Sequence, residues 1–189
     1  GCSQNMRGGI SRAAWVLAQA RQEGIVHFMD VGDGLFGAAP LPADAVPQQE
    51  RKARALAEAW KAMGLTLRVK GPLDDARGAA FREALKLPEL DPGAFRVVDQ
   101  VGVLSAPTGE AARALALRAR EAGARFVVAL VPQPFDELLR DSVQAREIDL
   151  FLSARSPDAL AAEENRLAGE KTKVAQVQSK GRSLLRVDV

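Results

Sequence analysis

Short apolar runs alternate with longer amphipathic stretches along most of this chain. Apolar residues recur at helical spacing in residues 48–64, and buried strands are expected at 25–31, 124–131 and 148–153. This alternation favours an α/β architecture over an all-helical one. A length of 189 residues is typical of one compact core, so we expect a single domain over residues 1–189.

Charge and cysteine usage exclude some classes of protein. The 26 basic and 24 acidic residues are interspersed along the chain, which argues against nucleic acid as a partner. No apolar run approaches the roughly 20 residues of a transmembrane helix. Cys2 is the only cysteine, and its place directly after a small residue is typical of lipid-anchored exported proteins. A free terminal thiol is the equal alternative, so a membrane tether through Cys2 stays open.

Several glycine-containing motifs follow one another in a fixed order. GGISRAA precedes DVGDGLFG, and later come an MG pair, GPLDDARG, LVPQP and IDLFLSARSP. In this order they resemble the N-terminal metallophosphatase domain of the 5′-nucleotidase family, a branch of the calcineurin-like phosphoesterases. The resemblance covers nearly the whole chain. The motifs lie at residues 8–14, 30–37, 63–64, 71–78, 130–134 and 148–157.

The resemblance implies a specific fold. It predicts an αββα sandwich, in which two mixed β-sheets pack together and helices flank both faces. A family chain would open with a strand bearing a D-x-H pair, and this sequence starts too late to contain it. Four loops, at residues 32–37, 71–78, 130–134 and 153–157, are expected to converge at one edge of the sandwich. An antiparallel pair of strands is expected at 173–178 and 183–189.

The resemblance also implies that the chemistry of the family is missing. Two divalent ions, each with several O and N ligands, would polarise a phosphate and activate a water molecule. Of the family's ligand positions, only the bridging aspartate matches, at Asp33. The remaining ligand and catalytic positions, an Asn and four His in the family, fall on Pro72, Leu73, Pro132, Arg155 and Pro157. Proline and leucine offer no ligand atom, and arginine keeps its proton and repels a cation. We therefore expect no metal, no other cofactor and no catalytic residue.

Four residues are candidates for the former cleft: Asp30, Asp33, Asp74 and Arg155. Asp30 and Asp33 have two interpretations, as a general acid–base pair or as residues that cap a glycine-rich loop. Loop capping is also expected for Asp74, although a weak mononuclear metal site with Asp33 stays open. Arg155 is expected to pair with Asp33 or Asp74, because buried carboxylates without a partner are costly. The only histidine, His27, is expected to be a packed residue rather than a ligand.

These features predict a non-catalytic domain that acts as a binding or structural module of the bacterial cell envelope. That compartment, outside the cytoplasm, is where the family is usually found, and a protein partner of unknown identity is expected. A metal-dependent 5′-nucleotidase-like phosphoesterase is the first alternative. The second is binding of an anion or small molecule in the former cleft, with Arg155 donating bidentate hydrogen bonds. Trp15 and Trp60 are expected in the core.

Overall fold

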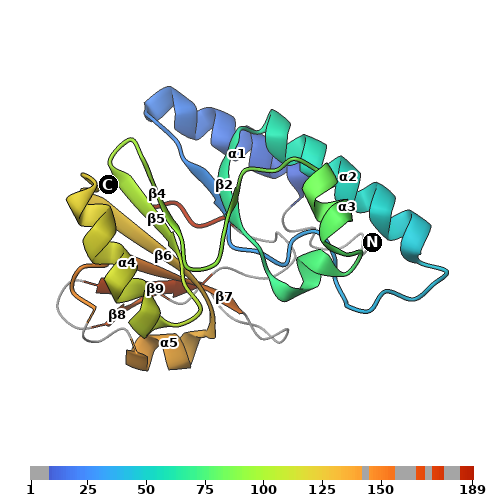
Figure 1. The fold of residues 1–189 in the computed structure, drawn as a ribbon. Helices are drawn as coiled ribbons and strands as arrows, with labels where there is room; N and C mark the ends of the chain where they lie inside the picture. Colours follow the sequence, from blue (N-terminus) through green and yellow to red (C-terminus); the bar gives the residue numbers. More distant parts are fainter. Residues whose placement is uncertain (1–8, 142–144, 156–164, 169–171, 177–183) are drawn as a thin grey trace.

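Two β-sheets pack face to face between two layers of helices in the computed structural model (Figure 1). The structure describes residues 9–141, 145–155, 165–168, 172–176 and 184–189. One sheet has three described strands in the order β1-β2-β3, and the other has six in the order β4-β5-β6-β7-β9-β8. The αββα sandwich predicted from the sequence is therefore confirmed.

The smaller sheet is parallel throughout its described strands. A helix joins β1 to β2, as is usual for the crossover between two parallel strands. Pro47 lies in the first turn of that helix, where its missing N–H costs nothing. The elements of this half are α1 (Ile10–Glu23), β1 (Phe28–Asp30), α2 (Val46–Ala62), β2 (Leu65–Val69), the 3₁₀ turn η1 (Pro72–Asp75), α3 (Ala79–Ala84) and β3 (Glu89–Leu90).

The larger sheet is mixed. Strands β5, β6, β7 and β9 are parallel neighbours, while β4 and β8 pair antiparallel at its two edges. Thr108 caps α4 by accepting a hydrogen bond from the N–H of Ala111. The elements of this half are β4 (Phe95–Val98), β5 (Val101–Ser105), α4 (Gly109–Glu121), β6 (Phe126–Pro134), α5 (Phe135–Asp141), β7 (Leu150–Arg155), β8 (Asn165–Ala168) and β9 (Thr172–Gln176).

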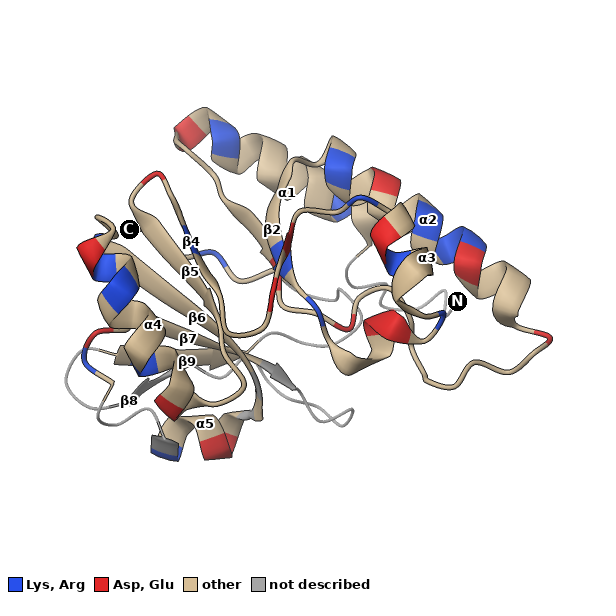
Figure 2. Cartoon of the chain, viewed as in Figure 1, with Lys and Arg blue, Asp and Glu red and all other residues tan. Residues whose placement is uncertain are grey.

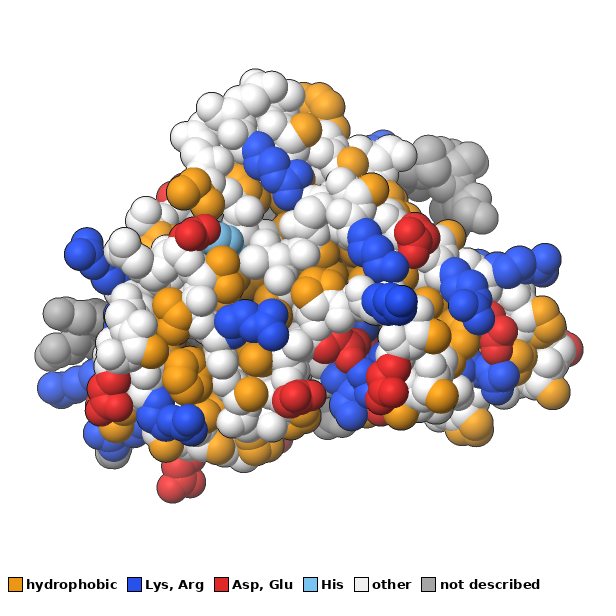
Figure 3. All heavy atoms as spheres, turned by 45° about the horizontal axis from the view of Figure 1, so that its top comes forward, with side chains coloured by type: hydrophobic (Ala, Val, Ile, Leu, Met, Phe, Trp, Pro, Cys, Tyr) orange, Lys and Arg blue, Asp and Glu red, His pale blue; other side chains and the backbone are white. Residues whose placement is uncertain are grey.

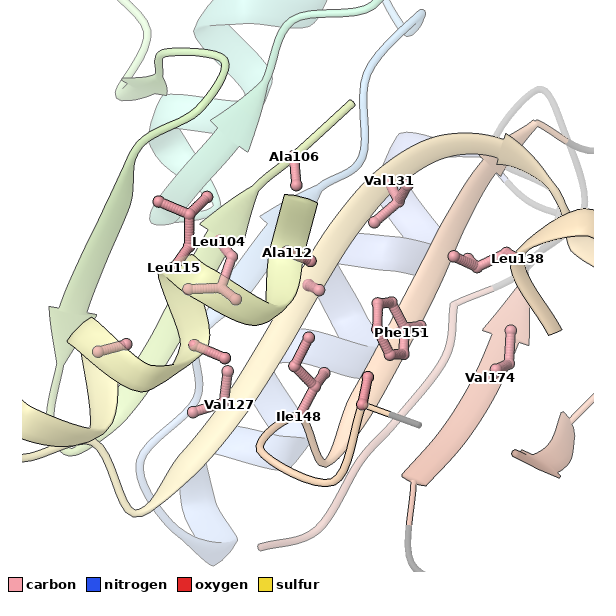
Figure 4. Packing of buried hydrophobic residues seen from close by; sticks show 14 of the residues in the cluster. Leu104, Ala106, Ala112, Leu115, Val127, Val131, Leu138, Ile148, Phe151 and Val174 are labelled. Atoms are coloured by element: carbon pink, nitrogen blue, oxygen red, sulfur yellow. The ribbon is translucent and has the colours of Figure 1, made fainter. Parts of the chain in front are cut away.

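Three apolar clusters hold the four layers together. The first lies between the two sheets and contains Leu67 of β2 and Leu130 of β6. The second joins the smaller sheet to α1, α2 and α3. The third lies between the larger sheet and helices α4 and α5, where Phe151 and Leu138 are fully buried (Figure 4). Each sheet is thus covered on both faces, as expected for parallel strands rich in apolar residues.

Two predictions about this fold are wrong. Strand β9 pairs with β7 and β8, and residues 184–189 form no strand, so the predicted hairpin between them is absent from the described chain. Trp60 is buried as predicted, but Trp15 is 66% exposed. Apolar residues occur all around α1, so their spacing did not reveal that Ala13, Ala14 and Leu17 form its inner face.

Within the described residues, no helix combines the length and the apolar character needed to cross a membrane.

Candidate functional site

The loops after β1, β2 and β5 meet at the carboxyl edge of the two sheets, next to β6. Open α/β sheets bind their ligands at this edge. A cavity of about 120 Å³ lies here, lined by Asp33 from the first loop, Gly71 from the second and Leu130 of β6. Ser105, at the end of β5, and Lys70 also line it. Two of the four loops that were expected to converge, at 32–37 and 71–78, therefore line one cavity. The other two predictions are wrong in their described parts, because residues 130–134 belong to β6 and residues 153–155 to β7.

Asp74 is the fully buried carboxylate at the base of this edge. Its Oδ2 atom accepts hydrogen bonds from the backbone N–H groups of Asp33 (3.0 Å) and Gly71 (2.9 Å). Its Oδ1 atom accepts one from the N–H of Leu35 (3.1 Å). Asp74 thus joins the loop after β1 to the loop after β2. Loop capping, one of the two roles considered for this residue, is its observed structural role.

Arg68 of β2 is a fully buried arginine directly beneath these loops. Its guanidinium donates to Asp74 at 2.5 Å, to Asp30 at 3.2 Å and to Glu89 at 3.1 Å. The guanidinium also lies over the ring of Trp60, 5.3 Å from the centroid. One cation therefore donates hydrogen bonds to carboxylates from the end of β1, from η1 and from β3, and stacks on an aromatic ring.

Further charged residues continue this cluster toward the surface. Arg82 of α3 bonds to Glu89 and to Asp75, and Lys70 lies 3.3 Å from Asp75. Burial alone would raise the pKa of Asp75, but hydrogen bonds from Arg82 and Lys70 together outweigh it and lower that pKa. Figure 2 shows acidic and basic residues side by side around β2. We call Asp30, Arg68, Asp74 and Glu89 the Arg68 cluster; its outer neighbours tie α3 to the same strands.

Asp33 interlocks with the loop after β2. It adopts a left-handed backbone conformation with φ of 55°, and its Oδ1 atom accepts a hydrogen bond from the N–H of Leu73 at 2.6 Å. A Cβ atom at Gly71 would overlap the Asp33 carboxylate. The two loops therefore need glycine at position 71, where only a hydrogen atom fits.

We expect Gly71→Ala to lower the free energy of unfolding by about 1–3 kcal/mol, because the added methyl group must displace Asp33 from Leu73. Urea denaturation followed by circular dichroism measures this change. Gly37→Ala is the matched control, since a Cβ atom at Gly37 meets nothing within 4 Å. Equal midpoints for the two variants would contradict the interlock.

Asp30 has a raised pKa. Burial is the largest cause; Asp74 adds to it by repulsion, and Arg68 opposes it. The folded state therefore takes up a proton on Asp30 at a higher pH than the unfolded chain, whose ordinary Asp pKa is 3.8. Proton uptake by Asp30 therefore adds to the free energy of unfolding. This contribution is fully present below pH 3.8 and is lost as the pH rises through the pKa of Asp30 in the folded state.

We expect Asp30→Asn to remove this contribution to the pH dependence. Between about pH 4 and pH 7, the native chain should gain stability relative to Asp30→Asn toward the acidic end, so the difference between their urea midpoints should change with pH. Parallel slopes of midpoint against pH for the two proteins would contradict the raised pKa.

The candidate residues divide into two groups. The structure brings Asp30, Asp33 and Asp74 together at one edge, through hydrogen bonds that Asp74 and Arg68 mediate. The backbone of Arg155 ends β7 at this edge, paired with Pro134, but its side chain lies outside the described part of the structure. Its predicted pairing with Asp33 or Asp74 stays a prediction. Cys2 and Pro157 also lie outside the described residues.

His27 lies just before β1 rather than in the middle of a strand. Its Nε2 atom is 3.7 Å from Oδ2 of Asp99, in the turn between β4 and β5, and its side chain is mostly buried. Among the described residues, no three His, Cys, Asp or Glu side chains are grouped so that they could hold a metal ion.

Sequence reasoning missed Arg68, which is the central residue of the site. One signal was available: Arg68 lies between Leu67 and Val69 in an apolar strand with helices expected on one face. The side chain of an arginine in such a strand is expected to be buried. A buried guanidinium is costly without partners of opposite charge, so carboxylates are expected beside it. The nearest carboxylates along the chain were Asp74 and Asp75.

Comparison with known proteins gives a fold but no sequence family. No family model and no curated protein matches this chain. Among solved structures, the sulfate thiohydrolase SoxB of Thermus thermophilus, in complex with glycerol, superposes with a TM-score of 0.69 at 18% identity, over 93% of this chain and 39% of that one.

Two nucleotidases superpose similarly well. The NAD nucleotidase NadN of Haemophilus influenzae gives a TM-score of 0.66 at 16% identity, over 93% of this chain and 40% of its own. A 5′-nucleotidase precursor from Thermus thermophilus gives 0.64 at 15% identity, over 91% of this chain and 43% of its own. This chain spans about two fifths of the length of these proteins. It therefore has the metallophosphatase-like fold of the 5′-nucleotidases over nearly all of its own length.

Proposed function

We propose that this chain is a non-catalytic metallophosphatase-like domain that acts as a binding or structural module, with a protein partner. The observation that carries this proposal is the Arg68 cluster. A buried guanidinium donates hydrogen bonds to three carboxylates near the carboxyl edge of the smaller sheet, so a protein cation already contacts all three. A divalent ion would have to displace Arg68 before Asp30, Asp74 or Glu89 could bind it.

The lining of the cavity supports the same proposal. Asp33 is its one carboxylate among the described lining residues, and the ammonium of Lys70 lies at the same cavity. Pro72, at the position of the family's asparagine ligand, has no coordinating side-chain atom. Two divalent ions need several oxygen and nitrogen ligands each, and these residues do not fit that requirement. No step of phosphate-ester chemistry is therefore assigned to the chain.

A phosphatase assay tests this proposal. The full chain, supplied with manganese or zinc and a chromogenic phosphate monoester, is expected to show no turnover above buffer containing the metal alone. Asp33→Ala should give the same baseline. Turnover by the native chain that Asp33→Ala abolishes would overturn the proposal and restore the hydrolase.

The second candidate is a metal-dependent phosphoesterase acting on nucleotides or related esters. The specific observation in its favour is the shared fold with two nucleotidases, together with Asp33 at the carboxyl edge of the sheets. The third is binding of an anion or small molecule without turnover, which the cavity itself favours. Calorimetric titration with inorganic phosphate separates the third from the first, because saturable binding weakened by Lys70→Ala supports an anion site.

We also propose that the module lies at the bacterial cell envelope, outside the cytoplasm, with Cys2 as the point of lipid attachment. The support for this placement is the sequence around Cys2 and the resemblance to an exported family. Labelling of the expressed chain with a radioactive fatty acid, compared with Cys2→Ser, tests the attachment. Equal labelling of the two would rule out Cys2.

A further inference from the structure

The cavity at the carboxyl edge of the two sheets has a mostly apolar lining. Its apolar residues come from both halves of the sandwich: Val31, Val69, Pro72, Pro92, Ala106, Pro107 and Leu130. Three of them are prolines, whose φ angle is fixed, so the lining is largely preformed. On the outer surface in Figure 3, hydrophobic side chains lie scattered among acidic and basic ones, as is ordinary for a protein surface. The cavity instead offers a ligand a connected apolar lining.

Ser105 adds a hydroxyl group to this lining. It ends β5, and its side chain shares a face of the strand with Val103, which packs between the two sheets. The residue is only 8% exposed. Its backbone N–H donates to the carbonyl of Ala94 and its carbonyl accepts from the N–H of Gly93, but within the described parts of the chain its hydroxyl has no hydrogen-bond partner. A buried hydroxyl without a partner is costly, so a ligand that bonds to it removes this cost.

The size and charge of the cavity restrict the ligand. Its volume is about 120 Å³, and a cavity of about 150 Å³ holds benzene, so it has room for roughly four to six non-hydrogen atoms. A water molecule needs roughly two to four polar partners, which a mostly apolar lining supplies poorly. Asp33 lines the same cavity, and Lys70, the other charged lining residue, already lies 3.3 Å from Asp75. An anion therefore meets a carboxylate, whereas an amide can both accept from Ser105 and donate toward Asp33.

We propose that this cavity binds a neutral amide that carries a short branched aliphatic group. The amide carbonyl accepts a hydrogen bond from the Ser105 hydroxyl, and the aliphatic group lies against Val31, Val69 and Leu130. A free short-chain amide has this chemistry, and so does a valine or leucine residue of a peptide, whose side chain lies next to a backbone amide. The proposal rests on the proposed function as a binding module and assigns a ligand class to the same site. The phosphatase assay does not measure this binding, so the two proposals can fail separately.

Titration with matched small probes tests the ligand class. Isobutyramide and isobutyrate have the same shape but differ in charge, and acetamide lacks the branched aliphatic group. Amide chemical shifts of the full chain, recorded by nuclear magnetic resonance at neutral pH, report binding. We expect saturable binding of isobutyramide, roughly tenfold weaker binding of isobutyrate, and no saturable shift with acetamide. Isobutyrate binding as tightly as isobutyramide, acetamide binding equally well, or no binding of isobutyramide would each overturn the proposal.

A fourth probe, N-acetylvalinamide, distinguishes the two sources of this chemistry. Binding tighter than that of isobutyramide supports the proposal with a peptide as the ligand. Weaker binding supports it with a free short-chain amide.

Ser105→Ala tests the role of the hydroxyl. It should weaken isobutyramide binding roughly two- to tenfold, as expected for the loss of one hydrogen bond. Without a ligand, its urea midpoint should equal or exceed that of the native chain, because the variant removes a buried hydroxyl that has no partner. Ser153→Ala is the matched control: Ser153 is also buried at a strand end, but its hydroxyl donates to the carbonyl of Gln133 at 2.6 Å. This control should lower the midpoint and leave isobutyramide binding unchanged.

Val31→Phe tests the location of the ligand, because the larger side chain fills part of the cavity. It should abolish isobutyramide binding while its circular dichroism spectrum stays like that of the native chain. Native-like binding by Val31→Phe or by Ser105→Ala would overturn the proposal. So would a loss of stability in unliganded Ser105→Ala as large as that in Ser153→Ala, since the hydroxyl would then have a structural role.

Discussion

Replacement of Arg68 by methionine is expected to lower the free energy of unfolding by about 3–5 kcal/mol, the usual cost of breaking a buried ion pair from one side. The variant leaves Asp30 and Asp74 without the guanidinium that they share, leaves Glu89 with Arg82 alone, and removes the cation above Trp60. Urea denaturation at neutral pH, followed by circular dichroism, measures the effect.

Two further variants make this expectation specific. Arg68→Lys keeps the charge but not the planar fork that reaches three carboxylates, so its loss should be smaller than that of Arg68→Met. Arg77→Gln removes a more exposed pair with Glu50 and should cost only about 0–1 kcal/mol. An Arg68→Met variant as stable as Arg77→Gln would show that the Arg68 cluster does not stabilise the fold.

Asp74→Ala is expected to destabilise the chain by a similar amount, about 3–5 kcal/mol, because Asp74 is buried and accepts from Arg68 and from three backbone N–H groups. Asp74→Asn keeps one acceptor oxygen and the shape of the side chain, so its loss should be smaller, about 1.5–3 kcal/mol.

Asp44→Asn is the matched control for these variants, since Asp44 is exposed, and should stay within about 0.5 kcal/mol of the native chain. Hydrogen exchange gives a local readout: Asp74→Asn should speed exchange of the Asp33, Leu35 and Gly71 amides more than exchange in the larger sheet. Uniformly faster exchange across both sheets would contradict a local role for Asp74.

Much of the architecture could be predicted because the spacing of apolar residues matched the helices and strands that formed. The helix after Pro47 has apolar residues at helical spacing, and residues 126–131 form an apolar run rich in valine, which is typical of a buried strand. The end of the chain was mispredicted because alternation in residues 173–178 and 183–189 fits a hairpin equally well. The strand that β9 pairs with in antiparallel fashion, β8, lies in a segment whose spacing indicated no strand.

The candidate site was predicted only in part. Asp30, Asp33 and Asp74 could be found because the motifs place them at the end of a strand or in the loop that follows one. No motif identified Arg68 as the cation that contacts these carboxylates. Arg68 lies within β2, and its three partners, Asp30, Asp74 and Glu89, lie 38, 6 and 21 residues away along the chain. Only the folded arrangement of β1, β2, η1 and β3 identifies it. The exposure of Trp15 was missed for the related reason that α1 is apolar on several faces.

The metal content of the purified chain tests the central claim most directly. The chain is loaded with excess manganese and zinc at neutral pH, dialysed against buffer without chelator, and analysed for both elements beside Asp33→Ala. We expect less than about a tenth of an ion per chain in both proteins, because the Arg68 guanidinium already contacts the neighbouring carboxylates and Pro72 offers no ligand. Near-stoichiometric metal in the native chain, lost in Asp33→Ala, would contradict the account.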